Sequence, residues 1–254
     1  MSTDLTQRFT GRANEYSSFR PGYPKELIDI LTAHSSFGPN TVIADIGSGT
    51  GILSELFLKN GNTVFGVEPN DAMRKIAEIN LKNYKRFVSV KGAAEATTLD
   101  GKSVDLITVG QALHWFDAVE AQKEFKRILD DKGYVCIIYN DRRLTSYSGI
   151  MEEYGRVVRL YGRERVSVGR VKDEKLSDYY PEWKIRKFSL PNKQSLNFEG
   201  LVGRIVSASY MPKPGEADYA SLRRDLKEVF DRCQERGQVA IEYETNLYIV
   251  TPTS

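Results

Sequence analysis

The stretch that decides the fold reads Asp45-Ile46-Gly47-Ser48-Gly49-Thr50-Gly51. It follows a short apolar run of strand length, residues 41–46. It precedes residues 52–59, where apolar side chains recur at helical spacing. Glycines between a strand and a helix allow a tight turn and let a ligand approach the backbone, and the helix start offers free N–H groups. The stretch therefore predicts a ligand-binding turn of a parallel α/β sheet.

The spacing of the glycines limits which ligand this turn holds. A dinucleotide fingerprint requires Gly-x-Gly-x-x-Gly. Here the third glycine, Gly51, comes one residue early, and position 52 is Ile. Asp45 lies directly before the turn, where its carboxylate would repel a pyrophosphate and attract a cationic amino-acid group. The turn favours a cationic ligand, and an oxidoreductase with an adenosine cofactor is the disfavoured alternative.

Glu68 is the second candidate for ligand binding. It ends the next predicted strand, residues 63–68, and lies 21 residues after Gly47. An acidic side chain there has two oxygens that accept hydrogen bonds from the two hydroxyls of a ribose. This position predicts a ligand with a ribose and does not tell which one.

Strand and helix signals alternate regularly up to about residue 140. The predicted strands are residues 41–46, 63–68, 87–90, 104–109 and 134–139, and the helices between them are 52–59, 71–82 and 117–129. Strands rich in Val and Ile are typical of parallel sheets with helices on both faces. Beyond them we expect strands at 183–190 and 238–251 and helices at 198–207 and 219–236. Ligands of such sheets bind beyond the carboxyl ends of the strands.

Composition narrows the class of protein. The 254 residues are 41% hydrophobic, with 36 Lys and Arg against 34 Asp and Glu. That is enough apolar material for a core, and the net charge of +2 gives no reason to expect a nucleic-acid partner. Two cysteines argue against a disulfide scaffold and a multi-cysteine zinc site. No apolar run of membrane-spanning length and no leader pattern is visible, so we expect a cytoplasmic protein. We also expect no bound metal.

Four ordered motifs resemble the class I S-adenosylmethionine-dependent methyltransferases. The chain is most similar to the type 11 group, which resembles the ubiquinone/menaquinone and trans-aconitate methyltransferases. The matching stretches are residues 45–51, 66–70, 93–95 and 103–116, within a resemblance that covers residues 9 to about 140. It implies a Rossmann-like α/β fold whose seven-stranded, mainly parallel sheet has helices on both faces, an antiparallel last strand and a partial cap.

The same resemblance implies how the chain is divided. Residues 1–38 would form an N-terminal lid or helical segment, and residues 39–140 the α/β core that binds S-adenosylmethionine. Residues 141–215 would form the partial cap and the acceptor-site region. Residues 216–254 would supply a helix and a strand that complete the sheet.

The resemblance also implies that S-adenosylmethionine is the cofactor and S-adenosylhomocysteine the product. Asp45 and the glycine turn would hold the methionine part, Glu68 the ribose, and Tyr16 or Arg20 the cofactor carboxylate. The predicted cofactor-binding residues are Asp45, Gly47, Ser48, Gly49, Gly51, Glu68, Pro69, Asn70, Ala94, Glu95, Gln111, Ala112, Tyr16 and Arg20.

Residues after the fourth and fifth strands are candidates for the reaction and the acceptor. His114 is a candidate general base, with a wall of the pocket or simple packing as its other roles. Arg142 and Arg143 have planar guanidinium forks that suit a carboxylate. The predicted substrate-binding residues are Trp115, Tyr139, Arg142, Arg143 and Tyr210.

These observations predict a transferase that moves a methyl group to a small molecule. The acceptor would be a small organic acid or an aromatic or isoprenoid-like compound, and its O, N or C atom would attack the sulfonium methyl in line. No nucleic acid and no membrane are expected as partners, and the oligomeric state stays open. Two further alternatives are a methyltransferase of RNA or protein and a non-catalytic homologue that binds the cofactor.

Overall fold

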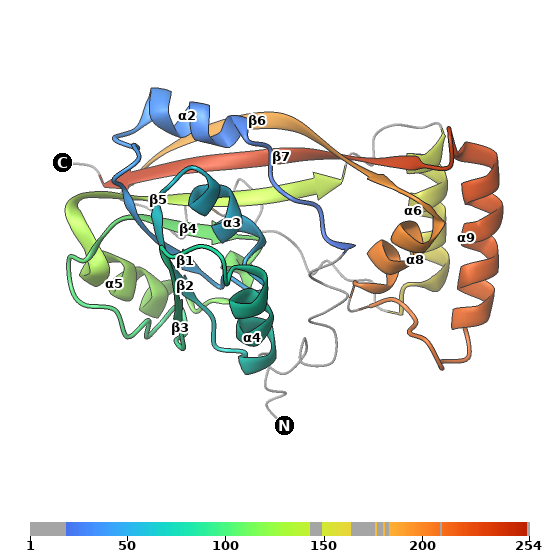
Figure 1. Cartoon of the computed structure of the whole chain (residues 1–254), viewed down its shortest axis with the longest axis horizontal. Coiled ribbons are helices and arrows are strands. Elements are labelled where there is room, and N and C mark those ends of the chain that lie inside the picture. The colour runs from blue at the N-terminus through green and yellow to red at the C-terminus, as the bar shows by residue number, and fades with distance from the viewer. Residues whose placement is uncertain are drawn as a thin grey trace.

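A seven-stranded sheet forms the centre of the protein (Figure 1). The structure is a computed structural model that describes residues 19–142, 149–163, 176, 180, 183–208 and 210–252. The strands follow the order β3-β2-β1-β4-β5-β7-β6. Their bounds are β1 Val42–Ile46, β2 Thr63–Val67, β3 Phe87–Val90, β4 Val104–Gly110, β5 Leu129–Arg142, β6 Trp183–Leu196 and β7 Val239–Pro252.

The strand directions confirm the predicted sheet. Strands β1 to β5 pair in parallel, whereas β7 runs antiparallel to both of its neighbours, β5 and β6. From β1 the strand order runs to β2 and β3 on one side and to β4 and β5 on the other. The order therefore switches sides at β1, and the carboxyl ends of β1, β2 and β4 lie together at this switch point. Ligands of open α/β sheets bind at such a point.

The described helices are α2 Glu26–His34, α3 Ile52–Lys59, α4 Asp71–Asn80, α5 Ala118–Ile128, α6 Ile150–Tyr161, α8 Phe198–Val206 and α9 Tyr219–Cys233. Side-chain caps define where several of them begin. Asn70 accepts hydrogen bonds from the N–H groups of Ala72 and Met73 at the start of α4. Asp117 and Asn197 cap α5 and α8 in the same way. Among the described residues, no helix combines the length and apolarity that crossing a bilayer requires.

Helices cover both faces of the sheet, as predicted. Along β5, Cys136 and Ile138 pack with α2 and α3, whereas Val135 and Ile137 pack with α5 on the other face. This alternation follows from the two-residue period of a strand. Both faces of β5 are therefore buried over residues 134–139, which explains why this part of the strand is apolar without a break.

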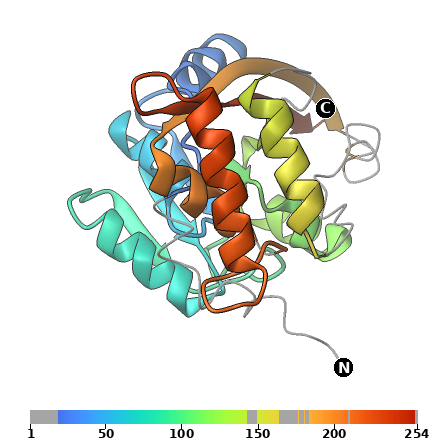
Figure 2. The same cartoon turned by 90° about the vertical axis from the view of Figure 1, so that its right-hand side faces the viewer.

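A second core lies where β6 and β7 extend beyond the other strands (Figures 1 and 2). Helices α6, α8 and α9 pack there against Leu196 of β6 and Val239, Ile241 and Tyr243 of β7. We call these three helices the helical lobe. Strand β6 continues past its predicted end at Leu190 to Leu196, through Pro191. An edge strand tolerates a proline because one side of its backbone needs no partner.

Candidate functional site

The glycine turn lies at the carboxyl end of β1, and its three glycines have positive φ angles. These are +68° at Gly47, +58° at Gly49 and +83° at Gly51. A Cβ atom at Gly47 would lie 2.7 Å from the Cβ of Ala112, and one at Gly51 would lie 2.6 Å from Cδ1 of Leu81. A Cβ at Gly49 would meet no described atom within 4 Å. Gly47 and Gly51 thus permit close packing, while Gly49 faces open space.

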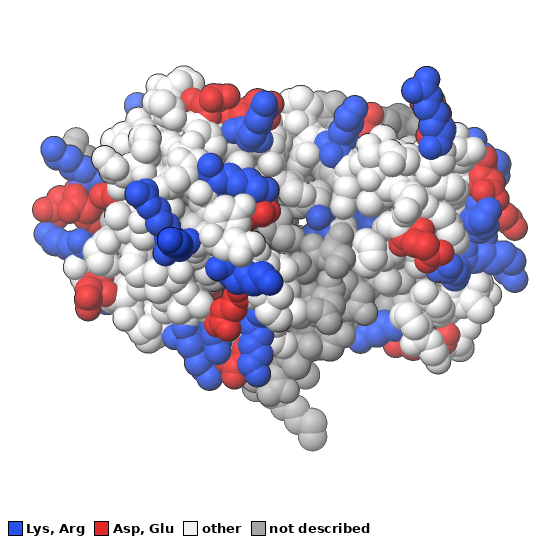
Figure 3. Space-filling model, in the orientation of Figure 1, with Lys and Arg blue, Asp and Glu red and all other residues white. Residues whose placement is uncertain are grey.

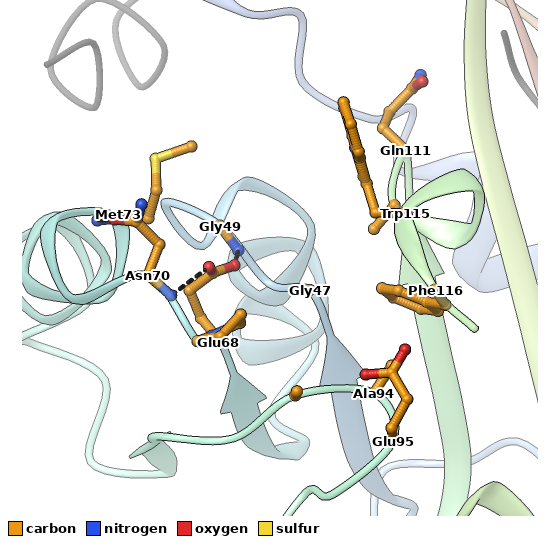
Figure 4. A pocket seen from close by; sticks show the side chains of 14 residues that line it. Gly47, Gly49, Glu68, Asn70, Met73, Ala94, Glu95, Gln111, Trp115 and Phe116 are labelled. Atoms are coloured by element: carbon orange, nitrogen blue, oxygen red, sulfur yellow. Dashed lines mark hydrogen bonds between the residues drawn. The ribbon is translucent and has the colours of Figure 1, made fainter. Parts of the chain in front are cut away.

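A cavity of about 180 Å³ lies over this turn (Figure 4). Four segments line it: the glycine turn, the end of β2 with the start of α4, residues 93–95, and the end of β4 with the short 3-10 helix Leu113–Trp115. The predicted residues that line it are Gly47, Gly49, Glu68, Pro69, Asn70, Ala94, Glu95, Gln111, Ala112 and Trp115. Residues from the motifs of four separate segments therefore meet around one cavity.

The cavity also includes residues outside the predicted set. They are Met73, Ala93, Gly110 and Phe116. The sequence signal that could have indicated Met73 is its position in the first turn of α4, the helix that follows Glu68. Figure 4 shows Met73 and Trp115 on opposite sides of the cavity.

Glu68 is held by two backbone N–H groups at the wall of the cavity. Its Oε2 accepts a hydrogen bond of 2.9 Å from the N–H of Gly49, and its Oε1 accepts one of 2.8 Å from that of Asn70 (Figure 4). Burial raises the pKa of this carboxyl, and the two N–H groups and Arg74 act in the opposite direction. Each carboxylate oxygen keeps a further lone pair, so two adjacent hydroxyls of a ligand have acceptors here.

Asp45 lies beneath the turn and not on the cavity wall. The side chain is 1% exposed and accepts hydrogen bonds from Ser54 Oγ at 2.6 Å and Thr108 Oγ1 at 3.0 Å. Burial raises the pKa of Asp45 to about 6. Its carboxylate thus connects β1 with α3 and β4 and supports the turn from below. Ser48 and Gly51 also lie outside the cavity lining.

The charged side chains among the described residues of the cavity wall are both acidic, Glu68 and Glu95. Oε1 of Glu95 accepts a hydrogen bond of 2.8 Å from the N–H of Asp117. The rest of the wall is mainly apolar, with Trp115 and Phe116 as its largest side chains. Carboxylates repel a pyrophosphate and attract an ammonium or sulfonium group. The lining therefore fits S-adenosylmethionine better than a dinucleotide.

His114 is placed beside the cavity and does not line it. Its ring contacts that of Trp115 at a centroid distance of 4.7 Å, with the two planes tilted by 43°. Burial lowers the pKa of His114 to about 4, and its Nδ1 has no hydrogen-bond partner within the described ranges. A group with so low a pKa is neutral at pH 7 and accepts a proton weakly. This placement favours the packing role among the three that the sequence left open.

The remaining predicted residues that the structure describes do not line the cavity. Tyr139 is buried in the core, and Arg142 donates a hydrogen bond of 3.1 Å to the hydroxyl of Tyr210. Arg20 donates one of 3.2 Å to the carbonyl of Ser207, just after α8. Tyr16 and Arg143 fall outside the described residues.

Gln111 connects the cavity to β5. It has a positive φ of +59°. Its Nε2 donates to the carbonyl of Asn140 at 3.2 Å. The end of β5 therefore lies one hydrogen bond away from the cavity wall.

Several known proteins with similar sequences are named as methyltransferases, most of them uncharacterized. The family model described as a methyltransferase domain matches residues 44–137. An uncharacterized methyltransferase-like protein of Schizosaccharomyces pombe is 25% identical over 238 residues, which cover 91% of this chain and 90% of that protein. An uncharacterized methyltransferase of Mycobacterium tuberculosis is 32% identical over 170 residues, which cover 65% of each chain.

Solved structures share the fold. A type II methyltransferase of Anaeromyxobacter dehalogenans superposes with a TM-score of 0.61 at 20% identity, over 92% of this chain and 98% of that one. A phosphoethanolamine N-methyltransferase of Haemonchus contortus, solved with S-adenosylhomocysteine, gives a TM-score of 0.57 at 15% identity, over 99% of this chain and 59% of that one. The sheet order, the family match to residues 44–137 and these relatives agree on the class I methyltransferase fold, and the same comparisons support S-adenosylmethionine as the cofactor.

Proposed function

We propose that this protein transfers the methyl group of S-adenosylmethionine to a small-molecule acceptor. The observation that carries this proposal is the acidic and apolar cavity at the switch point of the sheet, with Glu68 fixed at its wall. When bound, the cofactor supplies an electrophilic methyl group on a sulfonium, which is already an excellent leaving group. The protein therefore contributes alignment and exclusion of water more than acid–base chemistry.

Different lining residues would contribute to alignment and to the exclusion of water. The free lone pairs of Glu68 would accept the ribose hydroxyls, and the open space at Gly49 would let the ligand lie against the backbone. The carboxylates of Glu68 and Glu95 offset the positive charge of the ligand. Trp115 and Phe116 would keep water from the methyl group. An acceptor O, N or C atom forms a bond to the methyl carbon as the carbon–sulfur bond breaks, and a proton on that atom goes to solvent.

A segment before α2 supports a small acceptor over a macromolecule. Residues 19–24 cross the sheet end between the core and the helical lobe. The carbonyl of Gly22 accepts hydrogen bonds from Asn140 at 3.1 Å and Asn192 at 2.9 Å, and the carbonyl of Phe19 accepts one from Gln194 at 3.1 Å. A Cβ at Gly203 of α8 would lie 2.4 Å from the Phe19 ring, so the two pack closely. Such a cover leaves less room for a polymer than for a small molecule.

The surface charge supports the same proposal. On the face shown in Figure 3, basic and acidic side chains are interspersed over the core and the lobe. Nucleic-acid binders usually gather their lysines and arginines on one face. An RNA acceptor is therefore the weaker alternative.

Parallel calorimetric titrations with S-adenosylmethionine, S-adenosylhomocysteine and NAD test this proposal. The two methionine derivatives are expected to bind and NAD is not. A screen with methyl-labelled cofactor over small acids, phenols and amines then follows, with RNA and total protein as comparison substrates. Binding of NAD alone would refute the proposal. Label in RNA or protein but in none of the small compounds would refute the acceptor class. If neither methionine derivative binds, mass spectrometry of the denatured protein tells whether copurified product fills the site.

A further inference from the structure

Two arginines between the sheet and the helical lobe are held by phenols and not by carboxylates. Arg204, in the last turn of α8, is 5% exposed, and its Nε donates a hydrogen bond of 2.8 Å to the hydroxyl of Tyr243. Arg142, at the end of β5, donates to Tyr210 and lies 5.3 Å from the ring centre of Tyr154. Neither arginine has an acidic partner in the part of the chain that the structure describes.

This arrangement differs from that of the arginines on the surface of the same lobe. Arg156 of α6 pairs with Glu153 at 2.8 Å, and Arg223 of α9 pairs with Glu199. A buried charge is costly unless an opposite charge and hydrogen bonds compensate it. Phenol hydroxyls supply hydrogen bonds but no negative charge. Arg204, which is buried, and Arg142, which is half-buried, therefore lack the opposite charge that usually compensates such arginines.

The electrostatic effect of these arginines is visible at Tyr154. Burial alone raises the pKa of a phenol, yet the pKa of Tyr154 is lowered, because Arg204, Arg142 and Arg20 outweigh the burial. A negatively charged group is thus stabilised at this place in the fold.

The arginines lie near the cofactor cavity. Arg142 follows Asn140 by two residues on β5, a step of about 7 Å along a strand. The carbonyl of Asn140 accepts the hydrogen bond from Gln111, which lines the cavity. Arg142 also pairs across the sheet with Tyr243, the residue that binds Arg204. A small molecule could therefore span from the two arginines to the cavity.

We propose that Arg142 and Arg204 bind a carboxylate of the methyl acceptor, so that the acceptor is a small carboxylic acid. This inference rests on the proposed function, whose acceptor class it specifies. Two guanidinium forks match the planar shape of a carboxylate. Phosphate sites commonly add the free N–H groups of a helix start, whereas Arg204 lies at the end of α8. Because neither arginine lines the cavity, the bound carboxylate anchors the acceptor, and a different atom of it reaches the methyl group.

The test uses the full-length protein saturated with S-adenosylhomocysteine. Acetate, succinate, benzoate and phosphate are the anionic probes, and acetamide, succinamide and benzamide are their neutral counterparts, all at constant ionic strength. Thermal unfolding and calorimetry are measured for the wild type, Arg142→Gln and Arg204→Lys. The control is Arg156→Gln, a surface arginine of the same lobe that has a carboxylate partner.

We expect at least one carboxylate to raise the unfolding temperature of the wild type and of Arg156→Gln more than its amide does. Arg142→Gln should bind that carboxylate roughly tenfold or more weakly, the effect of losing one charge-assisted hydrogen bond. Arg204→Lys keeps the charge but loses the fork, so it should bind with intermediate affinity if it folds. Equal effects in the wild type and Arg142→Gln, no carboxylate effect at all, or an effect of phosphate alone would each refute the inference.

The cofactor titration separates the two proposals. If S-adenosylhomocysteine binds the wild type and Arg142→Gln equally well, the cofactor site is intact and the probe results concern only the arginines. If it binds neither protein and mass spectrometry of the denatured protein finds no copurified product, the proposed function has failed before the acceptor class is tested.

Discussion

Replacing Asp45 by asparagine tests whether a buried carboxylate beneath the glycine turn destabilises the fold at neutral pH. Burial raises the pKa of Asp45 from 3.8 to about 6, although Ser54 and Thr108 donate hydrogen bonds to it. The folded protein therefore holds this proton more tightly than the unfolded chain does. The contribution of Asp45 to stability is present in full below pH 4 and is lost as the pH rises through 6.

The magnitude follows from that difference in pKa. Each pH unit corresponds to about 1.4 kcal/mol, so the free energy of unfolding should fall by about 3 kcal/mol between pH 4 and pH 7 on account of Asp45. Asparagine has nearly the same shape and no charge. The hydroxyls of Ser54 and Thr108 rotate, so one can donate to its oxygen and the other can accept from its NH₂ group. The variant should lack this pH dependence.

Urea unfolding of both proteins at pH 4, 5, 6, 7 and 8 measures the effect. The quantity of interest is the difference in unfolding free energy between Asp45→Asn and the wild type, since other titrating groups largely cancel in it. This difference should grow in favour of the variant by about 3 kcal/mol from pH 4 to pH 7 and then stay level. A difference that does not change with pH would refute the reasoning, and so would one that grows in favour of the wild type.

Three further substitutions test the cavity. Gly49→Val places a side chain in the open space at the cavity, where no described atom lies within 4 Å, so it should lower the affinity for S-adenosylhomocysteine by roughly tenfold or more. Because Gly49 has a left-handed backbone, the variant should also lose about 1–2 kcal/mol of stability. The comparison variant is Gly47→Ala, whose Cβ would collide with Ala112, so it should lower the unfolding temperature as well. Unchanged affinity in Gly49→Val would show that the turn is not part of the binding site. Glu68→Ala should weaken S-adenosylhomocysteine binding by roughly 1.5–3 kcal/mol in calorimetry, the range for hydrogen bonds to a charged group, and equal binding would contradict a ribose contact. His114→Ala should keep cofactor affinity and retain methyl transfer at pH 7, because the imidazole is a weak base and does not line the cavity; loss of turnover with intact binding would assign it a direct role.

The local pattern of the sequence was enough to predict strands β1 to β5 and the helices between them. The apolar periodicity of a five-residue strand or an eight-residue helix lies within the segment itself, and the glycines of the turn indicate its backbone conformation. The residues of the cavity wall could be predicted for the same reason. The carboxyl ends of parallel strands meet at one edge, so residues such as Glu68 and Gln111 that follow different strands come together without further information.

Features that depend on neighbours distant in the chain could not be predicted. Strand β6 passes through Pro191 because it is the edge of the sheet, which its own sequence does not indicate. Asp45 lies outside the cavity lining because Ser54 and Thr108 converge on it from α3 and β4.

The sequence by itself thus determined the α/β core and the position of the cavity, because both arise from short-range periodicity and from the rule that parallel strands share a ligand-binding edge. Only the tertiary structure decided that Tyr243 pairs with Arg142 across the sheet and accepts a hydrogen bond from Arg204. These residues belong to β5, α8 and β7, and no spacing along the chain links them. The burial of their charges depends on how the helical lobe packs against the extended strands, and packing between distant segments leaves no local pattern in a sequence.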